Sequence, residues 1–224
     1  MKSPSGAVKL TYDDFVLFPD DGMRHELIDG EHYVTPSPNL IHQTILGNLY
    51  LVIASWLETN PIGHVYLSPL DVVISQFDVV EPDLLFVANA RAAHILTEKN
   101  VQGIPDLVVE IASRSTRRRD DTIKLQLYER AGAQEYWTVD PYLQIVRVYR
   151  RHDASLKLVI ELPRAGSEPL RSSLLPGLDI PMERIFSQHA GLLRPGHLGW
   201  PHRWDRSGFR AFRRVQFGTT RASV

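Results

Sequence analysis

A long helix is the clearest element that the spacing of apolar residues predicts. From about Asn39 to Leu57, apolar side chains recur at helical spacing, at Ile41, Ile45, Leu49, Val52, Ile53 and Trp56. This spacing places them along one side of a helix, as in a helix that packs on a core. Asn60 and Pro61 follow the pattern, and proline cannot continue a helix. We therefore predict a core helix that ends at these two residues.

Short apolar runs elsewhere predict strands, and Asp29-Gly30 predicts a tight hairpin turn between the first two of them. The runs Val65 to Ser75 and Val79 to Val87 are expected to pair, with the strand of Glu110 beside them. The remaining predicted elements are strands over 135–139, 145–149 and 157–162 and a helix from about 120 to 131. This order predicts an α/β fold with a mixed β-sheet flanked by helices and an N-terminal hairpin.

Two carboxylates interrupt the apolar strands. Asp83 precedes the run Leu84 to Val87, and Glu110 follows Leu107-Val108-Val109. Because side chains alternate along a strand, Glu110 is expected on the face of Val108, opposite Val109. A buried carboxylate is costly unless it is paired, hydrogen-bonded or bound to a metal. Asp83 and Glu110 are therefore candidate ligands of a hard cation such as Mg²⁺, and a partly exposed strand end or a salt bridge is the alternative.

Lys124 is the basic residue that would complete such a site. Hydrolysis of a phosphodiester needs an activated water and a positive group beside the charge that develops on the phosphate. Lys124 shares one helical face with Asp120 and Tyr128, at spacings of i, i+4 and i+8. Its stem could pack at the border of the core while its ammonium reaches a phosphate. The alternative is an ordinary amphipathic helix in which Lys124 pairs with Asp120.

Composition limits the classes of protein that remain. The chain has 224 residues, is 43% hydrophobic and carries a formal net charge of -1, so it can bury a core but has no global basic excess. It contains no cysteine, which excludes disulfides, thiolate zinc sites and a cysteine nucleophile. The N-terminus lacks the apolar core of a signal peptide, and no uninterrupted apolar run is long enough to cross a bilayer. We expect a cytoplasmic protein that does not bind membranes.

Basic residues cluster at two places despite the neutral total. Arg114, Arg117, Arg118 and Arg119 follow the Glu110 strand, where they could clamp backbone phosphates, or form only a solvated turn. From about residue 187 to 224 arginines alternate with aromatic residues, a mixture that can bind single-stranded nucleic acid. We predict one domain over residues 1–186 and a poorly ordered basic extension over 187–224.

Several short motifs in a fixed order resemble one known family. The motifs are Glu26-Leu27-Ile28-Asp29-Gly30-Glu31, Pro36-Ser37-Pro38 with His42, Glu81-Pro82-Asp83, Val108-Val109-Glu110-Ile111-Ala112-Ser113, then Asp120, Lys124, Tyr128, Gly132 and Glu135 to Pro141. In order and spacing they resemble the PD-(D/E)XK nucleases, and more narrowly the Uma-two family of restriction endonucleases. The resemblance covers roughly residues 8 to 186 and implies a restriction-endonuclease-like core.

The resemblance also implies roles for individual residues. Asp83 and Glu110 would bind the metal, with the carbonyl of Ile111 as an extra ligand. The usual lysine of the motif would stand at Ala112, so the resemblance implies that Lys124 replaces it from the following helix. Glu26 would approach the metal site and assist catalysis, or be only an exposed strand residue. His42 would contact the substrate or the carboxylates, although a lone histidine in a first helical turn is more often a surface or capping residue.

These expectations together predict an endonuclease that depends on Mg²⁺ or Mn²⁺. We expect its substrate to be DNA rather than RNA. His42, Arg117, Arg118 and Arg119 would bind the nucleic acid. Cutting both strands would favour a homodimer. A catalytically inactive nuclease-fold module that binds nucleic acid or a protein partner is the alternative, because a fold alone does not decide function. Hydrolysis of another phosphate compound is a third possibility.

Overall fold

The computed structural model describes residues 8–35, 37–113 and 120–187. The predicted phosphate-binding residues Arg117, Arg118 and Arg119 lie outside the described residues, as does the predicted basic extension beyond Ser187. The side chain of Asp120 also lies outside them, so its predicted pairing with Lys124 stays a prediction.

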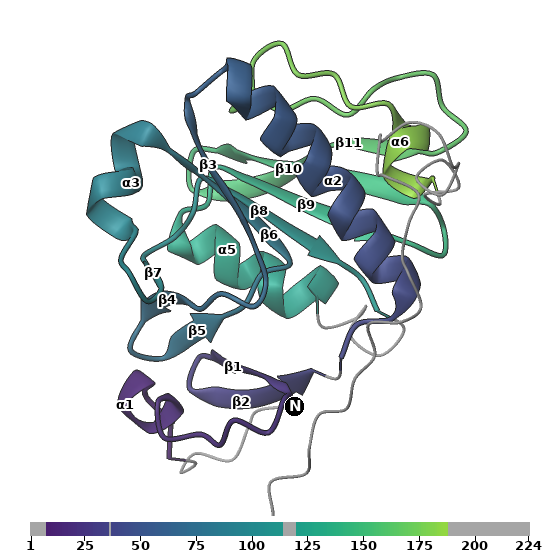
Figure 1. Cartoon of the computed structure of the whole chain (residues 1–224). Coiled ribbons are helices and arrows are strands. Elements are labelled where there is room, and N and C mark those ends of the chain that lie inside the picture. The colour runs from purple at the N-terminus through teal and green to yellow at the C-terminus, as the bar shows by residue number, and fades with distance from the viewer. Residues whose placement is uncertain (1–7, 36, 114–119, 188–224) are drawn as a thin grey trace, which may run out of the picture. The chain divides into compact units, whose positions relative to one another are not determined.

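A six-stranded mixed sheet forms the centre of the fold (Figure 1). Its order is β11-β10-β9-β8-β6-β3, with β8 and β9 parallel and the other neighbouring pairs antiparallel. The strands span Gly63–Leu67 (β3), Leu84–Ala88 (β6), Leu107–Ile111 (β8), Glu135–Asp140 (β9), Ile145–His152 (β10) and Ser155–Pro163 (β11). All five residues of β8 and all six of β9 are buried, as expected for central strands covered on both faces.

The predicted long helix covers one face of this sheet. α2 spans Leu40–Thr59, begins at an Asn39 side chain that caps the His42 amide, and ends at Asn60. Ile45, Leu49 and Ile53 of α2 are buried in the same core as Val109 and Trp137. Among the described residues, α2 is the one helix that is long and apolar enough to cross a membrane, by length and composition alone, whereas the sequence predicts no apolar run of that kind. The buried side of α2 packs on the sheet, as in the core helix of a folded domain.

The predicted hairpin belongs to a second, five-stranded sheet. The order is β2-β1-β5-β4-β7, with strands Arg24–Ile28 (β1), Glu31–Thr35 (β2), Val72–Ser75 (β4), Asp78–Val80 (β5) and Val101–Gln102 (β7). Asp29 and Gly30 both have positive φ, 54° and 75°, as a two-residue primed turn requires. The four-residue helix α1 (Tyr12–Phe15) starts with a capping box at Thr11, and Tyr12 and Phe15 pack on the outer face of this sheet.

A helix between the two sheets joins their cores. α5 (Leu125–Ala131) follows a π-helical turn, η1 (Asp120–Lys124), and ends at Gly132, as its sequence predicts. Leu127 and Tyr128 of α5 share one buried cluster with Ile28 of the hairpin and Val108 of β8. Val108 therefore faces α5, whereas Val109 faces α2, which confirms the predicted alternation of β8.

The predicted pairing of Val65–Ser75 with Val79–Val87 is wrong in one respect. Each run is divided between the two sheets, so that β3 pairs with β6 and β4 pairs with β5. Pro69 and Pro82 lie at the two division points, where the missing N–H of proline interrupts a ladder. The sequence predicts one mixed sheet, and the structure has two.

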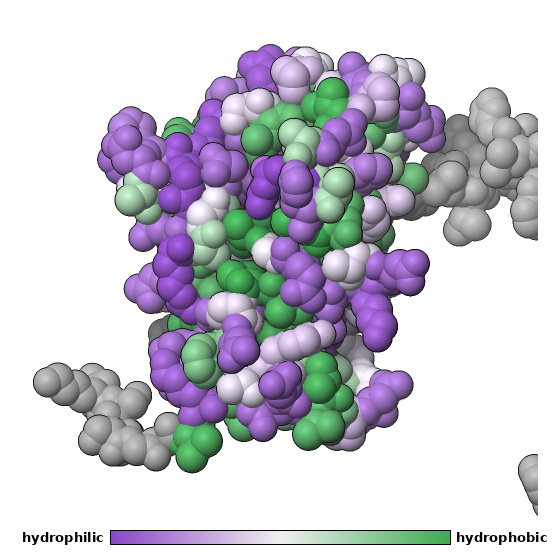
Figure 2. Space-filling view, turned by 90° about the vertical axis from the view of Figure 1, so that its left-hand side faces the viewer, coloured by the Kyte–Doolittle hydropathy of each residue, from purple (hydrophilic) through white to green (hydrophobic). Residues whose placement is uncertain are grey.

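The remaining helices close the ends of the core. α3 (Asn89–Ile95) follows β6, and α6 (Met182–Phe186) packs on α2, where the Asn48 side chain donates a 3.0 Å hydrogen bond to the Ile185 carbonyl. On the face in Figure 2, hydrophilic residues protrude around an area in which hydrophobic residues reach the surface. Such a mixture is ordinary for a folded domain.

Candidate nuclease site

The two predicted carboxylates occupy neighbouring positions at one end of β6 and β8. Leu84 pairs with Val109, so one further step along the antiparallel register brings Asp83 beside Glu110. Both side chains are buried, with relative exposures of 2% and 3%. The backbone N–H of Ile111 donates a 2.7 Å hydrogen bond to Oδ2 of Asp83, which fixes the carboxylate against β8. The two acids therefore converge, as the metal-site prediction requires.

Asp83 is held by two basic side chains in addition to that amide. Arg24 Nη1 donates to Oδ1 at 2.8 Å, and His42 Nε2 lies 3.0 Å from Oδ2. Burial by itself would raise the pKa of Asp83, but the His42 hydrogen bond and the His42 and Arg24 charges lower the pKa to about 2. His42 is buried rather than a surface residue, and it contacts a carboxylate as one of its two predicted roles required. Asp83 is thus ionised at neutral pH.

Lys124 reaches the other carboxylates from η1. Its Nζ donates to Oε1 of Glu110 at 2.8 Å and to Oε1 of Glu26 at 2.9 Å. Tyr128, one helical turn later, donates its hydroxyl to the same Glu110 oxygen at 2.6 Å. Lys124 is only 2% exposed, so both ion pairs lie in a medium of low dielectric constant. The predicted face of Lys124 and Tyr128 therefore points at Glu110.

The location of α5 between the sheets explains how one lysine contacts both acids. Glu110 stands on β8 of the six-stranded sheet, whereas Glu26 stands on β1 of the five-stranded sheet. Ala112, where the usual motif has its lysine, follows β8 and donates its N–H to the Val139 carbonyl. Lys124 thus places a positive charge beside Glu110 from η1, and its predicted role as the replacement for the motif lysine stays a prediction.

Glu26 and Glu81 add two further acids beside the pair. Glu26 is fully buried, and its Oε1 accepts a 3.1 Å hydrogen bond from the Glu81 N–H. Burial opposes ionisation of Glu26, but the Lys124 and Arg24 charges lower its pKa. Burial raises the pKa of Glu81 to about 7, aided by the negative charges of Asp71 and Glu26. The Glu81 carboxyl is therefore a weaker acid than those of Asp83 and Glu26.

The structure brings five of the predicted site residues together: Asp83, Glu110, Lys124, Glu26 and His42. Ile111 contacts the site through its backbone N–H, which donates to Asp83. The metal-binding role of its carbonyl stays a prediction. Sequence reasoning gave no role to Arg24 or Glu81, although Arg24 donates hydrogen bonds to Asp83 and to the Glu81 carbonyl. Alternation along β1 could have found Arg24, because it lies two residues before Glu26 and shares its face.

The chemistry of the acidic cluster suits a cation. Within the described residues, the carboxyl groups of Glu26, Glu81, Asp83 and Glu110 lie together with the permanent positive charges of Arg24 and Lys124. Oxygen donors with excess negative charge are what Mg²⁺ or Mn²⁺ binds. Within the described residues, no group of three or more His, Asp or Glu side chains has the arrangement of a metal site. A divalent ion at Asp83 and Glu110 would therefore replace some of the present contacts to basic side chains.

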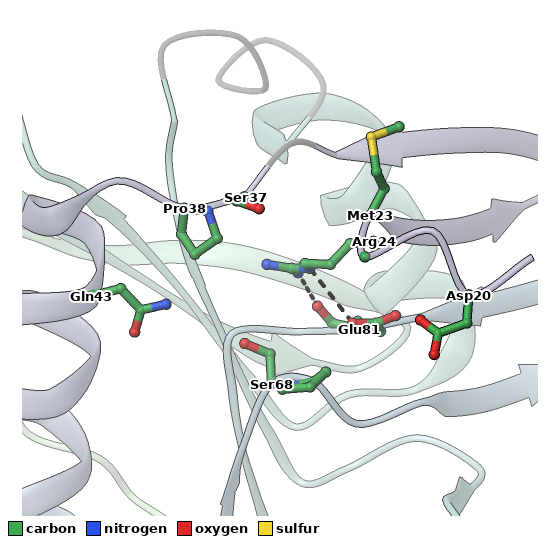
Figure 3. Close-up of a pocket in the computed structure, with 10 residues that line it drawn as sticks. Asp20, Met23, Arg24, Ser37, Pro38, Gln43, Ser68 and Glu81 are labelled. Atoms are coloured by element: carbon green, nitrogen blue, oxygen red, sulfur yellow. Dashed lines mark hydrogen bonds and ion pairs between the residues drawn. The ribbon is translucent and has the colours of Figure 1, made fainter. Parts of the chain in front are cut away.

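An open pocket adjoins this cluster (Figure 3). It has a volume of about 380 Å³ and lies between the start of β1, the first turn of α2 and the loop after β3. Arg24 and Glu81 form part of its wall, and dashed lines in Figure 3 join them. Because Arg24 also donates to Asp83, the pocket and the buried acids are immediate neighbours.

Comparison with known proteins agrees with this architecture. A crystal structure of "a putative nuclease belonging to DUF820" from Anabaena variabilis ATCC 29413 superposes with a TM-score of 0.67 and 21% sequence identity. The match covers 79% of this chain and 97% of that chain, and at this identity it shows the restriction-endonuclease-like fold. None of the curated proteins matches the sequence.

The sequence model of the Uma2 family, described as "Putative restriction endonuclease", matches residues 12–183, which is more than half of the chain. This span includes β1 with Glu26, the Asp83 and Glu110 strands, and the helix that carries Lys124. The chain therefore belongs to the Uma2 family.

Proposed function

We propose that the protein is an endonuclease that hydrolyses phosphodiester bonds of DNA with Mg²⁺ or Mn²⁺. The observation that carries the proposal is that Lys124 Nζ, which η1 holds, lies within 2.9 Å of an oxygen of Glu110 and of Glu26, and that Glu110 stands on β8 beside Asp83. A nuclease of this class needs oxygen ligands and one positive group at the same place, and these residues supply both.

Asp83, Glu110 and the carbonyl of Ile111 would hold the metal. When bound, the ion supplies Lewis-acid polarisation of the phosphate and a water of lowered pKa. Arg24 and His42 keep Asp83 ionised, so this ligand is ready at neutral pH. Lys124 donates hydrogen bonds to the attacking water or to the phosphate oxygens as negative charge develops on them. Glu26 orients Lys124 by accepting one of its hydrogen bonds.

The protein's partners follow from this chemistry. We propose DNA as the substrate ahead of RNA, with Arg117, Arg118 and Arg119 binding backbone phosphates beside the acids. Each copy has one such site, so cleavage of both strands at one position would use a second copy of the chain.

A plasmid-nicking assay with Mg²⁺ or Mn²⁺ tests the proposal. We expect Asp83→Asn and Lys124→Ala each to lower the cleavage rate by roughly 100-fold or more, because each removes a group that acts on the developing charge. Asp153→Asn and Lys157→Ala are matched controls, since both residues are exposed and lie away from the acids. Thermal unfolding of every variant confirms that it is folded.

Cleavage that persists in both Asp83→Asn and Lys124→Ala would refute the assignment of the site. Cleavage by the wild type that is unchanged by EDTA would refute the metal dependence. A wild-type protein that binds DNA but cuts it with neither metal would support the second candidate, a nucleic-acid-binding module. The observation that favours this candidate is that protein donors already satisfy Asp83 and Glu110.

A further inference from the structure

One buried carboxylate beside the candidate site has no hydrogen bond. Among the described residues neither oxygen of Glu81 accepts one, and Oε2 reaches only Arg24 Nε, at 3.7 Å. Glu81 as a whole is 9% exposed, and what remains exposed belongs to the wall of the 380 Å³ pocket. Glu81 thus has an ion pair with Arg24 but no hydrogen bond. A buried carboxylate oxygen that accepts no hydrogen bond is destabilising, and at the wall of a pocket it can be satisfied by a ligand that carries a donor.

The charge of the pocket argues against a phosphate as that ligand. Asp20 and Glu81 line it, and its one basic side chain is Arg24. The Arg24 guanidinium is already engaged, because it donates to Asp83 and to the Glu81 carbonyl. An anion would therefore meet two carboxyl groups, those of Asp20 and Glu81, beside an arginine that already pairs with Asp83 and Glu81. A neutral ligand that carries N–H donors would instead complement the Glu81 carboxylate.

The other walls suit a flat, partly apolar ring. The lining also includes the apolar residues Met23, Pro38 and Pro69, while Gln43 from α2 and Ser68 from the loop after β3 add polar groups (Figure 3). The volume lies at the small end of the roughly 300–1,000 Å³ that is common for ligand pockets. Bases taken out of a duplex are typically held in this manner, by apolar contact with their faces and hydrogen bonds to their edges.

We propose that this pocket binds one unpaired nucleobase of the substrate, and that the Glu81 carboxylate accepts a hydrogen bond from its exocyclic amino group. Adenine, cytosine and guanine carry such a group. Thymine and uracil present a single ring N–H between two carbonyl oxygens, which the carboxylate would repel. The inference rests on the proposed nuclease function, and it assigns to the site a preference for nucleic acid with an unpaired nucleotide.

Binding measured without cleavage tests the pocket separately from the chemistry. The probes are fluorescent duplexes that are identical except for one bulged position, which holds an adenine, a cytosine, a guanine, a thymine or an abasic residue. Affinities are measured by fluorescence anisotropy in EDTA, so that binding is observed without cleavage. For the wild type we expect bulged adenine, cytosine and guanine to bind roughly tenfold more tightly than bulged thymine or the abasic site, which is about 1.4 kcal/mol.

Two substitutions in the pocket should change this pattern. Glu81→Gln replaces a pure acceptor by an amide that also donates, so we expect the preference against thymine to shrink to about twofold or less. Gln43→Ala, on the opposite wall, should weaken binding of all four bulged bases relative to the abasic duplex. Glu58→Gln is the matched control, because it makes the same change at an exposed residue near the far end of α2.

Equal affinity of the wild type for all five probes would overturn the inference, as would a Glu81→Gln variant with the wild-type preference. Selective binding in a protein that cuts no DNA would support the pocket while refuting the nuclease proposal. Metal-dependent cutting with no selectivity among the bulged bases would support the nuclease proposal and refute the base-binding pocket.

Discussion

At the scale of single residues, the site is a set of buried charges that stabilise one another. Lys124 contacts two acids and Asp83 accepts hydrogen bonds from three donors, so no charge of the group stands without an opposite partner or a hydrogen bond. Removing one member of such a group leaves the others uncompensated, which is more destabilising than losing the pair as a whole. Substitutions that keep shape and alter one interaction are therefore the informative ones.

Tyr128→Phe removes one hydrogen bond and keeps the ring, which packs 5.0 Å from the ring of Tyr136. The lost bond is the 2.6 Å contact from the hydroxyl to the Glu110 carboxylate. We expect the free energy of unfolding to fall by about 2 kcal/mol, the usual size for a buried hydrogen bond to a charged group. Urea denaturation measures it, and Tyr50→Phe, at a partly buried tyrosine on α2, is the control. Equal effects of the two substitutions would contradict the prediction.

Asp83→Asn tests the pKa of the ligand carboxylate. Folding lowers the pKa of Asp83 from 3.8 to about 2, so the ionised carboxylate stabilises the protein above pH 3.8, and that stabilisation disappears as the pH falls toward 2. Its size is about 2 kcal/mol from the shift in pKa. We expect the stability difference between wild type and Asp83→Asn to be largest near neutral pH and to shrink below pH 4. A difference that stays constant or grows in acid would show that the pKa is not lowered.

At the scale of elements, the site depends on where two strands and one helix begin and end. β6 starts directly after Asp83, and α5 starts directly after Lys124. The end of α5 is fixed by Gly132 at φ 95°, and the close approach of β3 to β6 is fixed by Gly63. Gly132 allows a left-handed backbone at the end of α5, whereas Gly63 allows two strands to approach closely. Replacing each by alanine tests the two roles separately.

Gly132→Ala and Gly63→Ala should differ in severity for physical reasons. A Cβ at Gly132 meets no atom within 4 Å, so alanine suffers only the left-handed backbone, about 1 kcal/mol. A Cβ at Gly63 would clash with the Val87 carbonyl and the Phe86 ring, so the two strands must move apart. We expect a loss of roughly 3 kcal/mol or a failure to fold there. Chemical denaturation measures the free energy of unfolding of both variants. A larger loss for Gly132→Ala than for Gly63→Ala would contradict the roles given to the two glycines.

At the scale of the whole molecule, the chain is nearly neutral, so binding of nucleic acid would depend on local clusters of basic residues. A net charge of -1 gives no general attraction for a polyanion. If the proposed phosphate contacts of Arg117, Arg118 and Arg119 form, we expect them to contribute to the salt dependence of binding.

A triple substitution of Arg117, Arg118 and Arg119 by glutamine tests this balance. Each phosphate contact that is lost lowers the slope of log affinity against log salt by about 0.9, so three lost contacts lower it by about 2 to 3. Titration of a duplex at several salt concentrations measures the slope. The control replaces Arg164, Arg171 and Arg184, which removes equal charge from the C-terminal part of the described chain. If the slope of log affinity against log salt falls equally in both triple variants, the change in net charge alone explains the result, and the proposed phosphate contacts are refuted.

Local patterns in the sequence were enough to predict the main helices and strands and to name most residues of the candidate site. Helical spacing predicted α2, Asp29-Gly30 predicted the hairpin, and alternation placed Glu110 with Val108, because these patterns depend only on local backbone geometry. The tertiary structure decided the division into two sheets and the insertion of α5 between them, since both depend on contacts between residues distant in the chain. It also decided that Lys124 meets Glu110 and Glu26 together, that Arg24 binds Asp83, and that Glu81 faces a pocket without a hydrogen bond. Local patterns assign a side chain to a face of its own element, and only packing brings those faces to one another.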